Sequence, residues 1–472
     1  MLLYYKAIYK TMNKEGEMTK MSIKININIP QNVKEIAMKL ENAGYEAYIV
    51  GGCVRDAILE RKNKDWDITT SAPVDVIKSI FSGKEAATLN IAGSLEHGVC
   101  FVLYNGEQYE IATFRKDGDY IDGRHCEVVT GVPLHEDLKR RDFTINAMAI
   151  RILTGEFIDL FGGYEDCKKR RIVAVGRAKD RLGEDSLRIA RAFRFAAQLG
   201  FEIDEEILNA IDDLKINIPQ VSEERRENEF TKIICSNDCE RILTQMYNMG
   251  VMEYILPELK TIMECEQNNP NHCYNVGIHT LKCMSNTPPI KELRYAALFH
   301  DFGKPNTKTT DELGIDHFKG HANVSCELAN VILRRMKFEN SFIAKVTTII
   351  EYHDSDFLTK KSIRRFLGKY DENLLDMVLI LRMADTLAQN PKHNMDEKKQ
   401  KIEMARELIK EVIANENAFS LKDMAISGKD LIAIGIKPGV RMGEILKTLY
   451  EEVLENPDLN TYDILIEKAK NM

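Results

Sequence analysis

Two aspartates separated by one residue are the clearest candidates for metal chemistry in this sequence. Asp65 and Asp67 flank Trp66, and residues two apart point to the same side of an extended strand. Two carboxylates on one face suit Mg²⁺ that also takes oxygen ligands from a nucleoside triphosphate. An isolated pair of this kind is more often a solvated surface turn, so its meaning depends on the residues around it.

The residues before the aspartate pair fit a phosphate-binding site. Gly51 and Gly52 let backbone amides approach phosphate oxygens closely, and Arg55, followed by Asp56, adds a positive charge. These features at this spacing favour a catalytic interpretation over the solvated turn.

A third carboxylate follows in the alternating stretch 109–115. Glu110 could position an attacking 3′-hydroxyl group in a two-metal phosphoryl transfer. On spacing alone, Glu110 could equally be an ordinary exposed strand residue.

Charge is unevenly distributed along the 472 residues. The whole chain has a formal net charge of −8, whereas residues 139–194 contain 14 Lys and Arg against 8 Asp and Glu. The overall charge argues against indiscriminate nucleic-acid binding but leaves room for a local basic track. A solvated helix face would have similar charge.

The elements that must position these residues change in type along the chain. Residues 23–150 show a mixed pattern, with a helix predicted over Gln31–Asn42. Strands are predicted at Tyr48–Val50, Val99–Tyr104 and Tyr109–Phe114. From Glu184 onward the apolar periodicity is helical, and Gly200 is a predicted stop.

Taken in order, the motifs of the first half resemble the class II CCA-adding branch of the polymerase-β-like nucleotidyltransferases. The resemblance rests on Gly51-Gly52, Arg55-Asp56, Asp65, Asp67, Arg140–Ala147, Asp159–Gly163 and Glu184–Arg188. It implies an α+β fold, in which a head with a small sheet is followed by an all-helical neck, body and tail. Glu60 stands where the family usually carries the glycine of a turn, which would alter a loop only.

The resemblance also implies roles for residues outside the carboxylate site. Arg141 would contact the triphosphate, and Arg191 and Arg194 would contact the nucleotide or its phosphates. Asp185 and Arg188, expected one turn apart on a helix that opens at Glu184, would select the base. Cytosine and adenine both present an amino donor beside a ring-nitrogen acceptor, so a carboxylate and a guanidinium would admit them and reject uracil and guanine. The alternative is an Asp–Arg pair that only stabilises an exposed helix.

A second metal centre is indicated farther along the chain. His279, His300-Asp301 and Asp385 resemble the ligand set of an HD-type phosphohydrolase, which would hold a second divalent metal. His317, His321 and His353 could bind its substrate or a further metal. Such a domain could also persist as a helical RNA-binding body without metal.

These observations predict four domains. They are a nucleotidyltransferase head at residues 23–155, a helical neck with the selection helix and an RNA-binding region at 156–265, an HD-type helical domain at 266–400, and a helical tail at 401–472 that contacts tRNA.

Ten scattered cysteines without CxxC pairs predict reduced thiols and a cytoplasmic location. The sequence shows no membrane-spanning run and indicates no obligate protein partner, and it leaves open whether translation starts at Met1 or Met21.

The predicted function is untemplated addition of CCA to tRNA 3′ ends from CTP and ATP, with Mg²⁺ as cofactor. Segments Ala92–Gly98 and Lys116–Arg124 resemble those of full CCA-adding enzymes. A poly(A) polymerase, or the A-adding enzyme of a split system, is the alternative within the class. A protein whose main activity is that of a metal-dependent HD phosphodiesterase or phosphatase is the alternative from another class.

Overall fold

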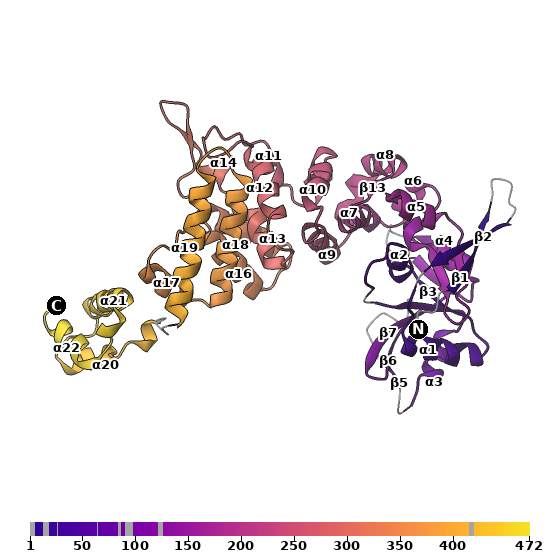
Figure 1. The fold of residues 1–472 in the computed structure, drawn as a ribbon, viewed down its shortest axis with the longest axis horizontal. Coiled ribbons are helices and arrows are strands. Elements are labelled where there is room, and N and C mark those ends of the chain that lie inside the picture. Colours follow the sequence, from indigo (N-terminus) through magenta and orange to yellow (C-terminus); the bar gives the residue numbers. More distant parts are fainter. Residues whose placement is uncertain are drawn as a thin grey trace. The chain divides into compact units, whose positions relative to one another are not determined.

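A mixed sheet of seven strands forms the centre of the first half of the chain (Figure 1), in the part that the structure describes. The structure is a computed structural model that describes residues 5–12, 18–25, 27–63, 65–83, 86–89, 98–120, 126–414 and 420–472. In spatial order the strands are β11 (Phe157–Asp159), β10 (Met148–Arg151), β3 (Ala47–Val50), β4 (Asp67–Thr70), β7 (Glu107–Thr113), β6 (Val99–Tyr104) and β5 (Ala86–Leu89). Only β4 and β7 run parallel among these neighbours.

The predicted α+β head is therefore confirmed. The predicted helix is α1 (Gln31–Asn42), whose buried residues recur at helical spacing from Val33 to Leu40. Strand β6 has the predicted bounds, β3 begins one residue earlier, and β7 begins two residues earlier and ends one residue earlier. An antiparallel hairpin of β1 (Tyr5–Met12) and β2 (Met18–Ile25) precedes α1.

Two compact units make up the chain, Met1–Ile233 with Asn248–Ile255, and Ile234–Tyr247 with Leu256–Met472. The first unit also contains helices α2 (Gly52–Ile58), α3 (Val74–Ile80), α4 (Leu134–Lys139), α5 (Gly163–Lys169), α6 (Ala178–Glu184), α7 (Leu187–Leu199) and α8 (Glu205–Leu214), and α9 (Glu223–Ile234) ends at its border. It also holds the two-stranded ladders β8 (Arg115–Tyr120) with β9 (Cys126–Thr130), and β12 (Arg171–Ile172) with β13 (Glu202–Ile203).

The prediction that a helix opens at Glu184 is wrong, because the chain breaks between two helices at this point. Helix α6 ends at Glu184, Asp185 has extended backbone angles (φ −145°, ψ 110°), and α7 begins at Leu187. The Asp185 carboxylate accepts a hydrogen bond from the Leu187 amide at 2.9 Å, which satisfies a free N–H of the new helix. Gly200 ends α7 in the left-handed conformation at φ 67°, as predicted.

The second unit is helical, as predicted, apart from a short ladder of β14 (Thr309–Thr310) and β15 (Asp316–His317). Its body contains α10 (Cys239–Asn248), α11 (Leu259–Met263), α12 (Val276–Ser285), α13 (Lys291–Phe299), α14 (Lys304–Thr307), α15 (His321–Arg335), α16 (Asn340–Tyr352), α17 (Lys360–Leu367), α18 (Glu372–Ala388) and α19 (Met395–Ala414). Helix α18 packs against α12, α13 and α16 (Figure 1).

The tail helices are α20 (Gly428–Ala433), α21 (Val440–Glu455) and α22 (Tyr462–Lys470). They share a hydrophobic cluster that includes Leu431, Leu449 and Leu465. Among the described residues, no helix combines the length and apolar character that crossing a bilayer requires.

Candidate functional site

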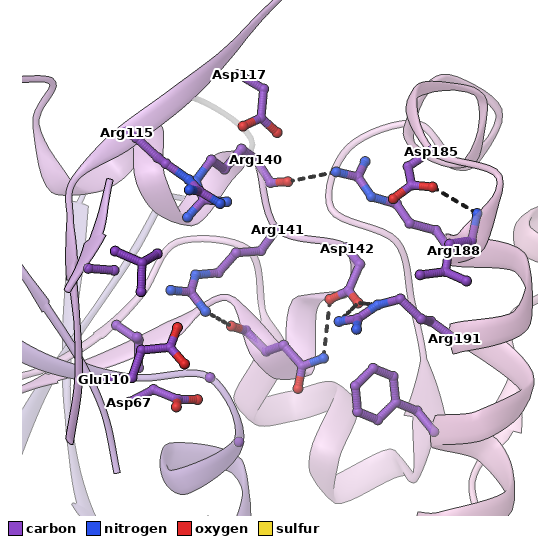
Figure 2. Close-up of a pocket in the computed structure, with 18 of the residues that line it drawn as sticks. Asp67, Glu110, Arg115, Asp117, Arg140, Arg141, Asp142, Asp185, Arg188 and Arg191 are labelled. Atoms are coloured by element: carbon purple, nitrogen blue, oxygen red, sulfur yellow. Dashed lines mark hydrogen bonds and ion pairs between the residues drawn. The ribbon is translucent and has the colours of Figure 1, made fainter. Parts of the chain in front are cut away.

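A cavity of about 840 Å³ in the first unit brings together most of the residues predicted for catalysis and nucleotide binding. Its volume is in the range of small-molecule sites. Among the described residues, eight arginines and five acidic residues line it: Arg55, Arg115, Arg140, Arg141, Arg188, Arg191, Arg194, Arg225, Asp67, Glu110, Asp117, Asp142 and Asp185. Figure 2 shows Asp67 and Glu110 on the sheet side, and Arg188 and Arg191 on the helix side. The excess of arginine suits an anionic ligand.

Asp67 and Glu110 meet because β4 and β7 are parallel and place them in register. Burial raises the pKa of Asp67; Arg141 lowers it, and Asp65 raises it again. Burial also raises the pKa of Glu110, and the charge of Asp67 adds to this effect. The two carboxylates therefore repel each other in a partly desolvated place, which is the electrostatic setting that a divalent cation relieves.

Asp65 differs from its prediction, because β4 begins at Asp67 and Asp65 lies two residues before the strand. Asp65 lines a second cavity, of about 570 Å³, together with Trp66 and Tyr109. Asp67 and Glu110 line both cavities. The carboxylates thus stand between two spaces, of which only the first is rich in arginine.

Gly51 is needed both for its conformation and for its lack of a side chain. Its φ of 73° lies in the left-handed region, and a Cβ atom there would lie 3.1 Å from Arg141 Nη1 and 3.9 Å from Asp67 Oδ2. Arg141 Nη1 donates to the Asn146 carbonyl at 3.3 Å, and Arg55 Nη1 donates to Asn146 Oδ1 at 2.8 Å. Asn146 therefore orients both predicted triphosphate-binding arginines.

Asp142 links the head to α7 and was not among the predicted site residues. Although burial opposes its ionisation, an ion pair with Arg191 and hydrogen bonds from Asn146 and Phe143 lower the pKa of Asp142 to about 2. Arg191 Nε donates to Asp142 Oδ2 at 2.7 Å, and Asn146 Nδ2 donates to Asp142 Oδ1 at 3.2 Å. The motif Arg141–Asn146 was visible in the sequence, but its partner on α7 was not.

Asp185 and Arg188 line the same cavity, but each forms its ion pair with a third residue and not with the other. Arg225 Nη2 donates to Asp185 Oδ2 at 3.0 Å. Arg188 forms an ion pair with Glu184, and it donates to the carbonyls of Arg181 at 2.8 Å and Arg140 at 3.2 Å. Arg188 is only 8% exposed, so the alternative of a pair on an exposed helix face is wrong.

Arg194 is held in the same way, by an ion pair with Glu229 of α9 at 2.6 Å. Three guanidinium groups surround the ring of Phe195, those of Arg194 at 4.0 Å and of Arg55 and Arg191 at 5.4 Å from the ring centre. Sequence reasoning missed Glu229 and Arg225, because each pairs with a residue distant in the chain. It also missed Phe195, because an aromatic residue on an apolar helix face reads as an ordinary core residue.

The four residues predicted for an HD-type metal site come together in the second unit. His279 Nε2 lies 2.8 Å from Asp385 Oδ1 and 3.5 Å from Asp301 Oδ2, and His300 Nε2 lies 3.3 Å from Asp301 Oδ2. Of the three further histidines, His321 and His353 join this group. His317 does not, because it sits on β15 and contacts Asp311 at 2.9 Å.

Two predicted discriminating segments fall wholly or partly outside the described residues. In Ala92–Gly98 the positions outside are 92–97, and in Lys116–Arg124 they are 121–124. The argument that these segments favour full CCA addition stays a prediction.

Carboxylates in register on two adjacent parallel strands, beside an arginine-rich cavity, are features that suit a nucleotidyltransferase. Three family models match this chain: "Poly A polymerase head domain" at residues 47–173, "Probable RNA and SrmB- binding site of polymerase A" at 200–263, and "tRNA nucleotidyltransferase domain 2 putative" at 308–469.

Curated relatives match over nearly the whole chain. The CCA-adding enzyme of Leuconostoc mesenteroides is 32% identical over 442 residues, covering 93% of this chain and 96% of its own. The enzyme of Ligilactobacillus salivarius is 33% identical, covering 94% and 98%. The crystal structure of the Bacillus stearothermophilus CCA-adding enzyme in complex with CTP is similar with a TM-score of 0.69 at 25% identity, covering 93% and 96%. This chain belongs to the CCA-adding enzyme family.

Proposed function

We propose that this protein adds CCA to tRNA 3′ ends from CTP and ATP without a nucleic-acid template. The observation that carries the proposal is the placement of Asp67 and Glu110 between two cavities. The arginine-rich cavity suits the incoming triphosphate, and the second cavity gives the tRNA 3′ end access to the same carboxylates. The relatives of nearly equal length, all called CCA-adding enzymes, support this assignment.

Asp65 and Asp67 would hold Mg²⁺, since their donors are hard carboxylate oxygens and their charges lie close together. Bound Mg²⁺ would supply positive charge that neutralises triphosphate oxygens. Gly51 and Gly52 leave room for the phosphates beside Arg55 and Arg141.

The transfer itself is an in-line displacement at the α-phosphorus. The 3′-oxygen of the tRNA forms a bond to this phosphorus while the bond to the pyrophosphate oxygen breaks. Glu110 lines both cavities and would orient the attacking hydroxyl by accepting its hydrogen bond. The raised pKa of Glu110 makes it a better proton acceptor than an exposed glutamate.

Base selection would rest on Asp185 and Arg188. Asp185 can accept a hydrogen bond from the amino group of cytosine or adenine, and Arg188 can donate to the adjacent ring nitrogen. Arg225 and Glu184 hold these side chains before the nucleotide arrives, which reduces the entropy lost on binding. Arg191 and Arg194, fixed by acidic partners, would contact the nucleotide or its phosphates.

Several further assignments accompany this proposal. We retain the division at residues 23–155, 156–265, 266–400 and 401–472, with tRNA contacts in the neck and tail. We also place the protein in the cytoplasm, in keeping with nine free cysteines among the described residues.

The test is extension of tRNAs that lack CCA, CA or A, with Mg²⁺ and with CTP and ATP supplied separately and together. Growth that stops at CCA supports the proposal. Addition of A alone to a tRNA ending in CC would indicate the A-adding enzyme of a split system, and a long A tail would indicate a poly(A) polymerase. Asp65→Ala and Asp67→Ala are each expected to abolish addition.

We propose a cation-dependent phosphohydrolase activity as a second candidate, because His279, His300, Asp301 and Asp385 converge in a buried site. The intact carboxylate and arginine groups of the first unit argue against this as the main activity. Release of phosphate from the tRNA end without extension would make the phosphohydrolase the main activity and nucleotide addition the lesser candidate.

A further inference from the structure

We infer that the second cavity of the head binds the 3′-terminal nucleoside of the tRNA, with the base stacked on Trp66 and Phe101 and the 3′-hydroxyl at Glu110. This inference rests on the proposed function and specifies which part of the tRNA enters that cavity. It assigns a positioning role to two aromatic residues that belong neither to the carboxylates nor to the arginines of the site.

The second cavity continues the face of the sheet that carries the carboxylates. Asp67 of β4 is in register with Glu110 of β7, and Glu110 is in register with Phe101 of β6. Residues that lie directly opposite each other on neighbouring strands carry their side chains on the same face. The three side chains therefore form a row, in which Phe101 lies one strand beyond Glu110, about 4.8 Å farther across the sheet.

This row of side chains stands between the two cavities. The next pair on the same face of β6 and β7, Val99 with Ala112, lines the arginine-rich cavity. On the other side of the row, Gln108 lines the second cavity. Asp67 and Glu110 line both cavities, so an oxygen that they hold in the second cavity lies next to a phosphate bound in the first. This placement suits in-line attack by a 3′-oxygen.

The charge of the second cavity argues against a phosphate group inside it. Among the described residues that line it, four are acidic and none is a lysine, an arginine or a histidine; the acidic residues are Asp65, Asp67, Glu107 and Glu110. A phosphate would be repelled by these side chains. A nucleoside is neutral, and its ribose hydroxyls donate hydrogen bonds that carboxylates accept. The part of the tRNA that fits is therefore the terminal nucleoside and not a backbone phosphate.

Aromatic rings supply the apolar walls of the cavity. Trp66 and Phe101 are half-buried, so part of each side chain is exposed, whereas Tyr109 is only 6% exposed. Stacking on an aromatic side chain tolerates every base, because every base has a π-face. During stepwise addition the terminal nucleotide of the tRNA changes at each step. A stacking site can hold each successive end, whereas a site that reads base edges could not.

One wall of the cavity is fixed by hydrogen bonds before tRNA binds. The Tyr109 hydroxyl donates to Glu107, and Glu107 Oε2 also accepts from Asn32 Nδ2 at 3.0 Å. Asn32 lies on α1, so these bonds connect the strand that carries Glu110 to a helix. A preformed wall reduces the entropy lost when the nucleoside binds.

The first experiment compares two tRNAs that lack CCA, one with a normal 3′-terminal nucleotide and one whose terminal nucleotide is abasic. The kcat/KM for the first addition from CTP is measured with each tRNA. Removal of the base should reduce kcat/KM about tenfold in the wild-type protein, because stacking is lost. In Trp66→Leu and Phe101→Leu the ratio of the two values should fall toward one, and the KM for CTP should stay unchanged. Ratios equal to that of the wild type in both variants would overturn the inference.

Two further variants separate stacking from damage to the fold. Trp66→Phe keeps a ring at this position and should keep most of the wild-type ratio. Tyr164→Leu is the matched control, because Tyr164 is a half-buried ring on α5 that lines neither cavity, and its ratio should equal that of the wild type. A ratio that falls as far in Tyr164→Leu as in Phe101→Leu would overturn the role of stacking.

Tryptophan fluorescence measures the same contact without the reaction. Trp66 is the one tryptophan of the chain, so emission excited where tyrosine does not absorb reports on this cavity. Saturating tRNA with a normal 3′ end, without CTP or ATP, should quench the emission. The abasic tRNA at saturation should quench it less, because no base covers the indole ring. Equal quenching by the two tRNAs would overturn the inference.

The two readouts distinguish failure of this inference from failure of the proposed function. Quenching that depends on the terminal base, without extension by CTP or ATP, would overturn the proposed function and keep the nucleoside site. Extension to CCA with equal quenching and unchanged ratios would keep the proposed function and overturn the nucleoside site.

Discussion

Asp185→Asn is the change that most directly tests how the base is chosen. In the structure Asp185 Oδ1 accepts from the Leu187 amide and Oδ2 accepts from Arg225. Each carboxylate oxygen has two lone pairs, so an acceptor site remains for the amino group of cytosine. An asparagine keeps one oxygen but replaces the other by an NH₂ donor, which repels that amino group and can pair with the carbonyl of uracil.

The size of the effect follows from the interaction that is lost. A hydrogen bond to a charged group contributes about 1.5–3 kcal/mol. At about 1.4 kcal/mol per tenfold change, the preference for CTP over UTP should fall by about 10- to 150-fold. Arg188, held by Glu184 and two backbone carbonyls, stays in place because none of those contacts involves Asp185.

The assay measures kcat/KM for the first addition to a tRNA that lacks CCA, with CTP and UTP in parallel. Asp180→Asn is the control, because Asp180 lies on the adjacent helix α6, is exposed and forms an ion pair with Arg177, outside the cavity lining. The ratio should fall in Asp185→Asn and stay unchanged in Asp180→Asn. An unchanged ratio in Asp185→Asn would refute the assignment of this carboxylate to base selection.

Three further predictions concern the same unit. Asp67→Asn should abolish nucleotide addition and raise the Tm at pH 7, because burial raises the folded-state pKa of Asp67 and its ionised form therefore costs stability above that pKa. Asp142 should stabilise the fold by about 2 kcal/mol at pH 7, since its pKa is lowered from 3.8 to about 2; this contribution is present above about pH 4 and is lost as the pH falls toward 2. In urea unfolding at pH 7, Asp142→Asn should lose at least that amount, because it also leaves Arg191 unpaired. Gly51→Ala should raise the KM for CTP about tenfold, since the added methyl group would crowd Arg141.

Each of these predictions has a result that contradicts it. A lower Tm in Asp67→Asn would show that the charge stabilises the site, and an equal loss for Asp142→Asn at pH 2 and pH 7 would exclude an ionic origin. Gly176→Ala is the control for Gly51→Ala, because Gly176 also has a positive φ, of 77°, but open space around its Cβ position. If both alanine variants raised the KM for CTP equally, backbone strain and not crowding of Arg141 would be the cause.

Local patterns allowed much of the head to be predicted. Alternation of polar and apolar residues predicted β7 with Glu110 on its polar face, and the helical spacing of apolar residues predicted α1. The glycines and the aspartate pair indicated phosphate chemistry because conformational freedom and ligand type are properties of the residues themselves. The order of motifs indicated the family.

The pairing of side chains could not be predicted in this way. Asp185 is paired with Arg225, 40 residues away in the chain, and Asp142 with Arg191, 49 residues away. The break between α6 and α7 also went unpredicted, although Asp185 is a poor helix former whose carboxylate can accept from a nearby backbone amide, as it does from Leu187.

In the second unit, too, the sequence indicated the ligand types and the tertiary structure decided which of them meet. The sequence by itself determined that His279, His300, Asp301 and Asp385 are metal-ligand types with the spacing of an HD-type site. Only the tertiary structure decided that His321 and His353 join them while His317 does not. The reason is that ligand chemistry belongs to a side chain, whereas the few ångströms that make a ligand set depend on how separate helices pack.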